Sequence, residues 1–144
     1  MVLVFINVEA AVYHDGRYLM IVRGAEEDHA AGALAFPGGS LDYEVVPDIL
    51  EQTAAREVKE ETGVDVDLIE YAEAHTFTTP TGTPVLDVVF LCRYASGTPS
   101  ISDPGEVAAL QWMTADEILS DPASPPWMAP SLALVERKRH SLGW

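Results

Sequence analysis

The chain of 144 residues carries 23 acidic against 8 basic side chains, a formal net charge of −15. Such a charge repels the phosphate backbone of DNA and RNA and argues against a nucleic-acid-binding module. Hydrophobic residues make up 48% of the sequence and charged residues 22%, which is a globular composition and excludes a disordered or fibrous chain. The length suits one domain, so we expect a single domain over residues 1–144.

Cysteine content and hydropathy indicate the cellular compartment in which the protein is expected. Cys92 is the sole cysteine, which excludes an internal disulfide and a cysteine-based zinc site. The apolar run 1–6 lacks the basic flank and the small-residue cleavage site of a secretory signal, and no stretch approaches the length of a membrane span. We therefore expect a cytoplasmic protein with no membrane partner.

The first part of the chain predicts a β-hairpin followed by a loop. Two apolar runs rich in β-branched residues, 2–13 and 18–22, flank a turn-like segment at 14–17. Arg23 closes the second run, and it is equally well explained as an edge charge in solvent or as a phosphate contact. Residues 24–35 are small and polar and predict an exposed loop, in which His29 is more often solvated than functional.

A helix is predicted from about Asp48 to Thr62. Pro47 disfavours an earlier start, Asp48 is an N-cap type of residue with a glutamate three positions later, and Gly63 is a typical C-terminal stop. Apolar residues at helical spacing predict a stripe that faces the core.

Three glutamates crowd one side of this helix. Glu57, Glu60 and Glu61 stand at i, i+3 and i+4, so their charges repel unless cations neutralise them. A hard divalent metal ion is the natural counter-charge, although a solvated acidic helix face is a common alternative. Upstream, Gly38 and Gly39 follow a proline and predict a turn in which the backbone takes positive φ and approaches another group closely. A free carbonyl in such a turn can bind a cation, yet most turns of this kind have no function beyond the turn itself.

The second half predicts further strands and two helices. Residues 65–77 and 85–94 read as strands joined by a turn at 79–84, and a strand at 107–113 leads into a short helix capped by Thr114. A last helix is expected over 131–140. Asp87, isolated among apolar neighbours, either faces solvent or approaches a site, while Trp112 is expected in the core and His75 is more often structural than catalytic.

The segment from Arg56 to Val64 resembles the signature of the Nudix hydrolases, G-x5-E-x7-R-E-U-x-E-E-x-G-U with U apolar, and matches its second half at every fixed position. The first half departs from the pattern. Asp42 and Asp48 stand where the family has glycine and glutamate, and Gly39 lies three residues too early. A three-residue insertion within 43–47 accounts for this departure. Asp48 then either replaces the family's glutamate or is simply the N-cap of the helix. Glu44 and Glu51 are alternative sources of the missing carboxylate.

The resemblance implies the Nudix α/β/α sandwich with a mixed β-sheet, whereas periodicity alone predicts only a mixed αβ domain. It also implies Mg²⁺-dependent hydrolysis of a pyrophosphate bond in a nucleoside diphosphate linked to a moiety X, with Mn²⁺ as an alternative cation. This class includes nucleoside triphosphates, ADP-ribose and other nucleotide sugars. A catalytically weak Nudix-fold domain for nucleotide sensing or scaffolding is the alternative function, and dimers are frequent among such relatives.

The family's roles are carried onto matching positions. The resemblance makes Glu57 and Glu61 the principal metal ligands and Glu60 a further ligand, with the Gly39 carbonyl completing the site and Arg56 orienting the glutamates. The general base is one of these three glutamates, Glu57, Glu60 or Glu61, or else Glu106. Glu106 is expected as a further ligand or as the base, and it is equally well explained as an exposed loop residue. The expected substrate contacts come from three residues: Arg23, Gly38 and Gly39.

Overall fold

The computed structural model describes residues 1–41 and 44–144; Asp42 and Tyr43, on which part of the predicted insertion falls, lie outside the described residues. Along the described part of the chain, four strands precede a helix, three strands follow it, and two helices come last. Their bounds are β1 Phe5–His14, β2 Arg17–Arg23, β3 Leu34–Ala35, β4 Gly38–Ser40, α1 Ile49–Thr62, β5 Asp65–Thr78, β6 Pro84–Ser96, β7 Val107–Met113, α2 Ala115–Ser120 and α3 Met128–Leu142.

The strands form one mixed sheet of seven strands in the described part of the chain. The main order is β3-β2-β1-β6-β5, with β4 paired to β1 and β7 paired to β2. Only the central pair β1 and β6 is parallel among these pairings; the others are antiparallel. The predicted hairpin of β1 and β2 is confirmed, and β6 lies inside the sheet between β1 and β5, as its apolar sequence predicts.

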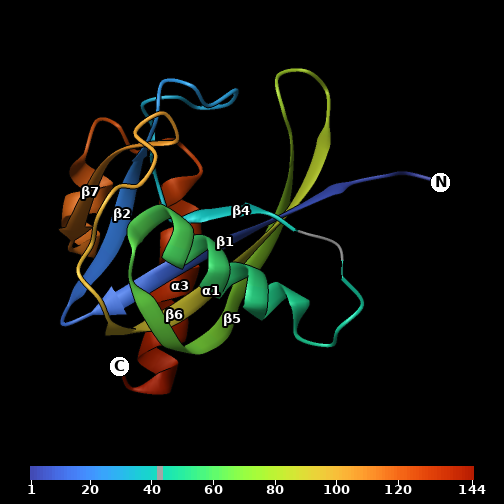
Figure 1. Cartoon of the computed structure of the whole chain (residues 1–144). Coiled ribbons are helices and arrows are strands. Elements are labelled where there is room, and N and C mark those ends of the chain that lie inside the picture. Colours follow the sequence, from blue (N-terminus) through green and yellow to red (C-terminus); the bar gives the residue numbers. More distant parts are fainter. Residues whose placement is uncertain (42–43) are drawn as a thin grey trace.

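Alternation along the central strands places two cores on opposite faces of the sheet, because successive side chains of a strand point to opposite sides. One core joins α1, through Ala54 and Val58, to alternate residues of β1 and β6. The other joins α3, through Leu132 and Val135, to the residues in between, such as Leu91. Figure 1 shows α1 and α3 on the two sides of the sheet, so the expected α/β/α sandwich is confirmed.

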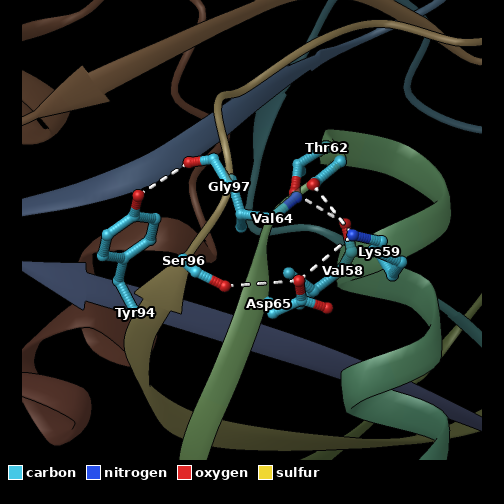
Figure 2. A network of polar contacts seen from close by, with 9 residues as sticks. Val58, Lys59, Thr62, Val64, Asp65, Tyr94, Ser96 and Gly97 are labelled. Carbon is cyan, nitrogen blue, oxygen red and sulfur yellow. Dashed lines mark hydrogen bonds and ion pairs between the residues drawn. The ribbon is translucent and has the colours of Figure 1, made fainter.

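The C-terminal end of α1 is fastened to β5 by the last residues of the motif. Gly63 takes a left-handed conformation, φ 78°, and donates its N–H to the Lys59 carbonyl. The Thr62 hydroxyl donates to the Val58 carbonyl at 2.6 Å, and Lys59 Nζ lies 3.1 Å from Asp65 Oδ2 at the start of β5 (Figure 2). The helix therefore ends at a fixed point on the sheet, which fixes the direction of its glutamates.

Apart from shifts of one or two residues, three features differ from the sequence prediction. Leu34 and Ala35 form a short strand on β2 instead of loop, because Leu34 is fully buried. The last helix begins at Met128, before the expected start, because Pro130 occupies its first turn, where a backbone N–H has no helical partner. Strand β1 begins at Phe5, and Met1 to Val4 are exposed.

Two predicted local contacts also differ. Asp48 precedes α1, but its side chain makes no capping hydrogen bond and instead accepts one from Gln52 Nε2 at 2.9 Å. Trp112 is only partly buried, although it packs against the α1 core beside Tyr94. By contrast, Thr114 caps α2 as predicted, accepting from the Glu117 N–H at 3.2 Å.

The packing of α3 predicts a sharp contrast between two leucines of one helix. Leu132 is 1% exposed and Leu134 is 39% exposed. Because Leu132→Ala leaves a cavity under the sheet, we expect it to lower the free energy of unfolding by about 2–5 kcal/mol in urea titrations. Leu134→Ala, the matched control, should change it by less than about 0.5 kcal/mol. Equal losses from the two variants would contradict the packing described for α3.

Candidate active site

Helix α1 brings two of its glutamates against strand β4. The backbone N–H of Gly38 donates to Glu61 Oε1 at 2.7 Å. A Cβ atom added at Gly39 would lie 2.5 Å from Glu57 Oε1, closer than real Cβ contacts come. Both glycines are extended residues of β4, so the expected positive-φ turn is wrong here. A side chain at position 39 would therefore force the Glu57 carboxylate to move away from β4.

Most of the predicted site residues line one cavity of about 300 Å³ beside β4. Glutamates of α1 form one wall, and Glu106, from the loop before β7, forms part of another. Six of the predicted residues line it: Arg23, Gly38, Gly39, Glu57, Glu61 and Glu106. Residues more than 80 positions apart thus meet at one place, although their individual roles stay predictions.

Glu60 and Arg56 lie at the edge of this cavity. The Glu60 side chain is 57% exposed and does not line the cavity. Arg56 Nη1 lies 3.1 Å from Glu60 Oε1 and 3.1 Å from Glu57 Oε1. The guanidinium therefore contacts two glutamates of the motif. The orienting role of Arg56 and the role of Glu60 as a ligand or base stay predictions.

Burial makes the two inward-facing carboxyls unusually weak acids. Desolvation raises the pKa of Glu57 to about 7, although the Arg56 guanidinium partly opposes this shift. Desolvation likewise raises the pKa of Glu61 to about 8, against the favourable hydrogen bond from Gly38. The pKa of Glu106 is also raised, first by desolvation and then by the neighbouring charge of Asp103. The positive charge near these carboxyls is therefore too small to offset the desolvation that raises their pKa values.

The residues present suit a small hard cation. No three Asp, Glu, His or Cys side chains of the described residues converge closely enough to hold a metal ion by themselves. Magnesium commonly needs only one or two carboxylates, with water and substrate phosphates as its other ligands. Glu57 and Glu61 provide two carboxylates on successive turns, and the missing side chain at Gly39 leaves the β4 backbone open to them. We judge that the donor set fits Mg²⁺ or Mn²⁺.

Arg23 stands where the cavity continues into a second one. Its Nη2 lies 2.9 Å from Glu27 Oε2, and its Nε donates to the His29 carbonyl at 2.9 Å. The side chain lines both cavities. The position of Arg23 between two cavities favours a contact with bound phosphates over a role as an edge charge in solvent. The phosphate contact stays a prediction.

The second cavity, of about 350 Å³, contains functional candidates that the sequence analysis did not assign. Asp87 is 2% exposed and accepts a hydrogen bond from Asn7 Nδ2 at 2.7 Å. Of the two environments expected for it, it therefore lies beside the cavity and does not face solvent. Glu9 lies beside it on β1, and desolvation and the Asp87 carboxyl raise the pKa of Glu9 well above its usual range. At both positions the sequence shows an acidic residue isolated in an apolar strand, and this pattern could have indicated a functional residue.

Two histidines have partners in this second cavity. The His29 ring stacks between Phe77 and Trp127 and does not stand free in solvent. His75 Nδ1 lies 2.7 Å from Glu73 Oε1, and its Nε2 lies 3.6 Å from Asp87 Oδ2. His75 thus lines the cavity with both ring nitrogens facing carboxyl groups, and the structural role expected for it stays a prediction.

Comparison with known proteins identifies the family. The family model of the NUDIX domain matches residues 5–135. A MutT-like protein of Streptomyces ambofaciens is 35% identical over 74% of this chain and 61% of its own length. The NAD-capped RNA hydrolase NudC of Vibrio atlanticus is 33% identical over 88% of this chain and 41% of its own length. The chain thus spans less than two thirds of these two relatives.

Solved structures agree on the fold. The crystal structure of a MutT NUDIX hydrolase from Burkholderia pseudomallei superposes with a TM-score of 0.77 at 27% identity, covering 91% of this chain and 97% of that one. The chain belongs to the Nudix family. Among the described residues, no helix has the length and apolar character needed to cross a membrane.

The raised pKa values predict a pH-dependent stability of the metal-free protein. Glu57 and Glu61 bind protons more tightly when folded than at their ordinary value of 4.5, so folding stability decreases as pH rises from about 4.5 to about 8. In EDTA, the unfolding temperature should therefore fall between pH 5 and pH 8, and Glu61→Gln should flatten part of this fall because glutamine does not ionise.

The matched control for this effect is Glu117→Gln, on the exposed side of α2. It removes one negative charge from the same chain and so reports the general effect of reducing the net charge. The two variants should differ in the slope of unfolding temperature against pH. Identical slopes for Glu61→Gln, Glu117→Gln and the unchanged protein would contradict the burial of the Glu61 carboxyl.

Proposed function

We propose that this protein hydrolyses a pyrophosphate bond in a nucleoside diphosphate linked to a moiety X, with Mg²⁺ as the preferred cation and Mn²⁺ as a substitute. The observation that carries the proposal is the convergence of Glu57 and Glu61 on the glycine backbone of β4, in a cavity that also contains Arg23. The family membership supports the same reaction class.

Each residue of the cavity has a place in this reaction. Glu57 and Glu61 would hold the cation together with the Gly39 carbonyl, and Arg56 would keep Glu57 in position through the contact at 3.1 Å. A bound divalent cation neutralises phosphate oxygens and lowers the pKa of water. Arg23 would contact the phosphates where the two cavities join, which gives an anionic substrate a local cation in a chain of net charge −15.

Glu106 is our choice for the group that accepts the proton of the attacking water. It lines the same cavity from the loop before β7, and it is not required to hold the cation. Its raised pKa also makes it a better proton acceptor than an ordinary carboxylate. The glutamates of α1 suit this role less: Glu57 and Glu61 would hold the cation, and Glu60 lies outside the cavity lining.

The substrate class follows from the relatives only in general terms. One relative carries the name of a hydrolase of NAD-capped RNA, and another is called MutT-like, which names no substrate. NAD contains a nucleoside diphosphate, the element common to the substrates proposed here. The proposal accordingly covers nucleoside triphosphates, ADP-ribose and other nucleotide sugars. A cytoplasmic location and a homodimer stay predictions, testable by cell fractionation and by light scattering.

The direct test is a substrate panel. The purified protein is incubated with nucleoside triphosphates, ADP-ribose, nucleotide sugars and NAD in the presence of Mg²⁺, and released phosphate, pyrophosphate and nucleoside monophosphate are measured. We expect turnover of at least one compound and none in excess EDTA. Binding of nucleotides without turnover at any Mg²⁺ or Mn²⁺ concentration would instead favour the sensing or scaffolding alternative.

The metal assignment predicts the effect of one atom exchange. Glu61→Gln removes a ligand charge while keeping the size of the side chain. Mutation of residues that only support a metal ligand typically costs roughly 10–100-fold in activity. We expect kcat of Glu61→Gln to fall by at least as much, because Glu61 would be a ligand itself. The dependence of the rate on Mg²⁺ concentration should shift to higher concentrations. Glu117→Gln, which removes an exposed charge from α2, should keep both values. Unchanged kcat and unchanged Mg²⁺ dependence in Glu61→Gln would reject the assignment.

A further inference from the structure

Two loops meet beside the candidate active site, and each of them adjoins or carries one of its residues. The first, residues 24–33, follows β2 and begins directly after Arg23. The second, residues 97–106, precedes β7 and ends with Glu106. Arg23 and Glu106 both line the cavity of about 300 Å³ beside β4. The contact between the loops therefore sets where the proposed proton acceptor lies relative to the proposed phosphate contact.

Backbone hydrogen bonds join the two loops. The Gly24 N–H donates to the Glu106 carbonyl at 2.7 Å. The Glu26 N–H donates to the Gly105 carbonyl at 3.2 Å. Within the second loop, the Asp103 carbonyl accepts the Glu106 N–H at 3.1 Å. The backbone of Glu106 is thus held on both sides, by its own turn and by Gly24.

A β-bulge gives Glu106 its partner on the first loop. The register of β7 against β2 shifts by one residue next to Arg23, which lies opposite Val107. In the unshifted register, Val107 would lie opposite Gly24. With the shift, the next pair is Gly24 and Glu106, in agreement with the hydrogen bond between them. Bulges are frequent beside active sites, where they redirect a side chain, and this bulge brings Glu106 to Gly24.

Gly24 leaves no room for a side chain. It is buried, and a Cβ atom added there would overlap the Gly105 carbonyl oxygen and lie 2.8 Å from the Glu106 carbonyl carbon. Both are backbone atoms, so the backbone of one of the two loops would have to shift. Arg23 is on the firmer side, because its backbone is hydrogen-bonded to residues 32–33 and its strand pairs with β1, β3 and β7. We therefore expect the loop with Glu106 to move.

Gly105, on the other side of the same contact, has different surroundings. The nearest atoms to a Cβ added at Gly105 belong to the carboxylate of Glu26. Glu26 is exposed, and its flexible side chain can turn away. Neither Gly24 nor Gly105 takes a left-handed φ, so alanine suffers no strain of that kind at either position. The same added atom thus meets backbone at one glycine and a mobile side chain at the other.

We propose that Gly24 is a positioning residue of the reaction, which holds the Glu106 loop against the end of β2 and so places the Glu106 carboxylate at the wall of the cavity. Gly24 does not itself line the cavity, so it acts through Glu106. A misplacement of about 1 Å near a reacting centre can cost about 100-fold in rate. This inference rests on the proposed function for the role of Glu106 as proton acceptor.

The test adds one carbon atom on each side of the contact and measures turnover of the best substrate of the panel with Mg²⁺. Gly24→Ala should lower kcat by about 100-fold, the loss expected for a misplaced reacting group. It should lower kcat/KM equally, because the contacts of the bound substrate are kept. Gly105→Ala, in which Glu26 can turn away, should lose far less. Equal losses from the two variants, or no loss from Gly24→Ala, would overturn the inference.

A double-mutant cycle separates positioning from general damage. Because Gly24→Ala is expected to act through Glu106, it should not lower kcat further in a protein that already carries Glu106→Gln. Gly24→Ala should also keep the affinity for Mg²⁺ titrated alone, because the proposed cation ligands lie on α1 and β4. Losses that multiply in the double variant, or a loss of Mg²⁺ affinity, would show that Gly24 acts elsewhere and would overturn the inference.

A second pair of variants covers failure of Gly24→Ala to fold, which its circular dichroism spectrum would reveal. Exposed Asp103 accepts the Gly105 N–H on Oδ1 at 3.0 Å, so Asp103→Ala loosens the second loop without adding an atom. We expect kcat to fall by about two- to tenfold, as for one lost hydrogen bond. Asp103→Asn removes the same charge but keeps an accepting oxygen, so it should restore most of kcat. Equal losses from the two variants would overturn the inference.

A measurement without substrate separates this inference from the proposed function. Amide hydrogen exchange at residue 24, followed by NMR, reports the hydrogen bond from its N–H to the Glu106 carbonyl. We expect protection of this amide in the unchanged protein and in Gly105→Ala, and its loss in Gly24→Ala. Protection that persists in Gly24→Ala would overturn the inference whether or not any substrate is turned over. The expected exchange without turnover of any substrate would reject the proposed function and leave the placement of Glu106 by Gly24 standing.

Discussion

Helix α1 lies against strand β4 at residue 39, which has no side chain. The Glu57 carboxylate occupies the position that a Cβ atom would need, and one turn later Glu61 accepts the Gly38 N–H. The rest of the fold maintains this contact. The core of Ala54 and Val58 holds the helix on the sheet, and the left-handed turn at Gly63 fixes its end on β5. The site is thus a close contact between one helix and one short strand.

This close contact has an electrostatic cost. Two carboxyls partly removed from water, with Glu106 facing the same cavity, disfavour the charged form and raise the pKa values of all three groups. A protein selected only for stability would gain by replacing them. A divalent cation removes the cost, because it favours the ionised form that burial disfavours. The divalent cation of the proposed reaction would therefore also relieve the electrostatic cost of the cavity.

Sequence reasoning reached this part of the structure because its spacing is local. Glu57 and Glu61 lie on adjacent turns, and the helix stop at Gly63 can be read from neighbouring residues. The role of Gly39 was predicted from the resemblance, but its reason was not: a turn was expected, and strand β4 with a close carboxylate was found. The three residues of β4 are too few for a strand pattern to appear.

The second cavity could not be predicted from the sequence because it depends on pairing across the sheet. Asn7 and Asp87 are 80 positions apart and become neighbours through the parallel register of β1 and β6. Nothing in either strand specifies that register. The one available signal, a single acidic residue in an apolar strand, identified Asp87 as unusual without indicating its partner. His29, Phe77 and Trp127 meet only after the loops are folded.

Proton release on metal binding tests the central claim most directly. Calorimetric titration of the unchanged protein with Mg²⁺ near pH 7, in buffers of different ionisation enthalpy, counts the protons displaced as the cation binds. Because the pKa values of Glu57 and Glu61 are raised to about 7 and about 8, we predict that protons are released near neutral pH and that the number falls in Glu61→Gln. Binding without proton release, or equal release from both proteins, would contradict the account of the site.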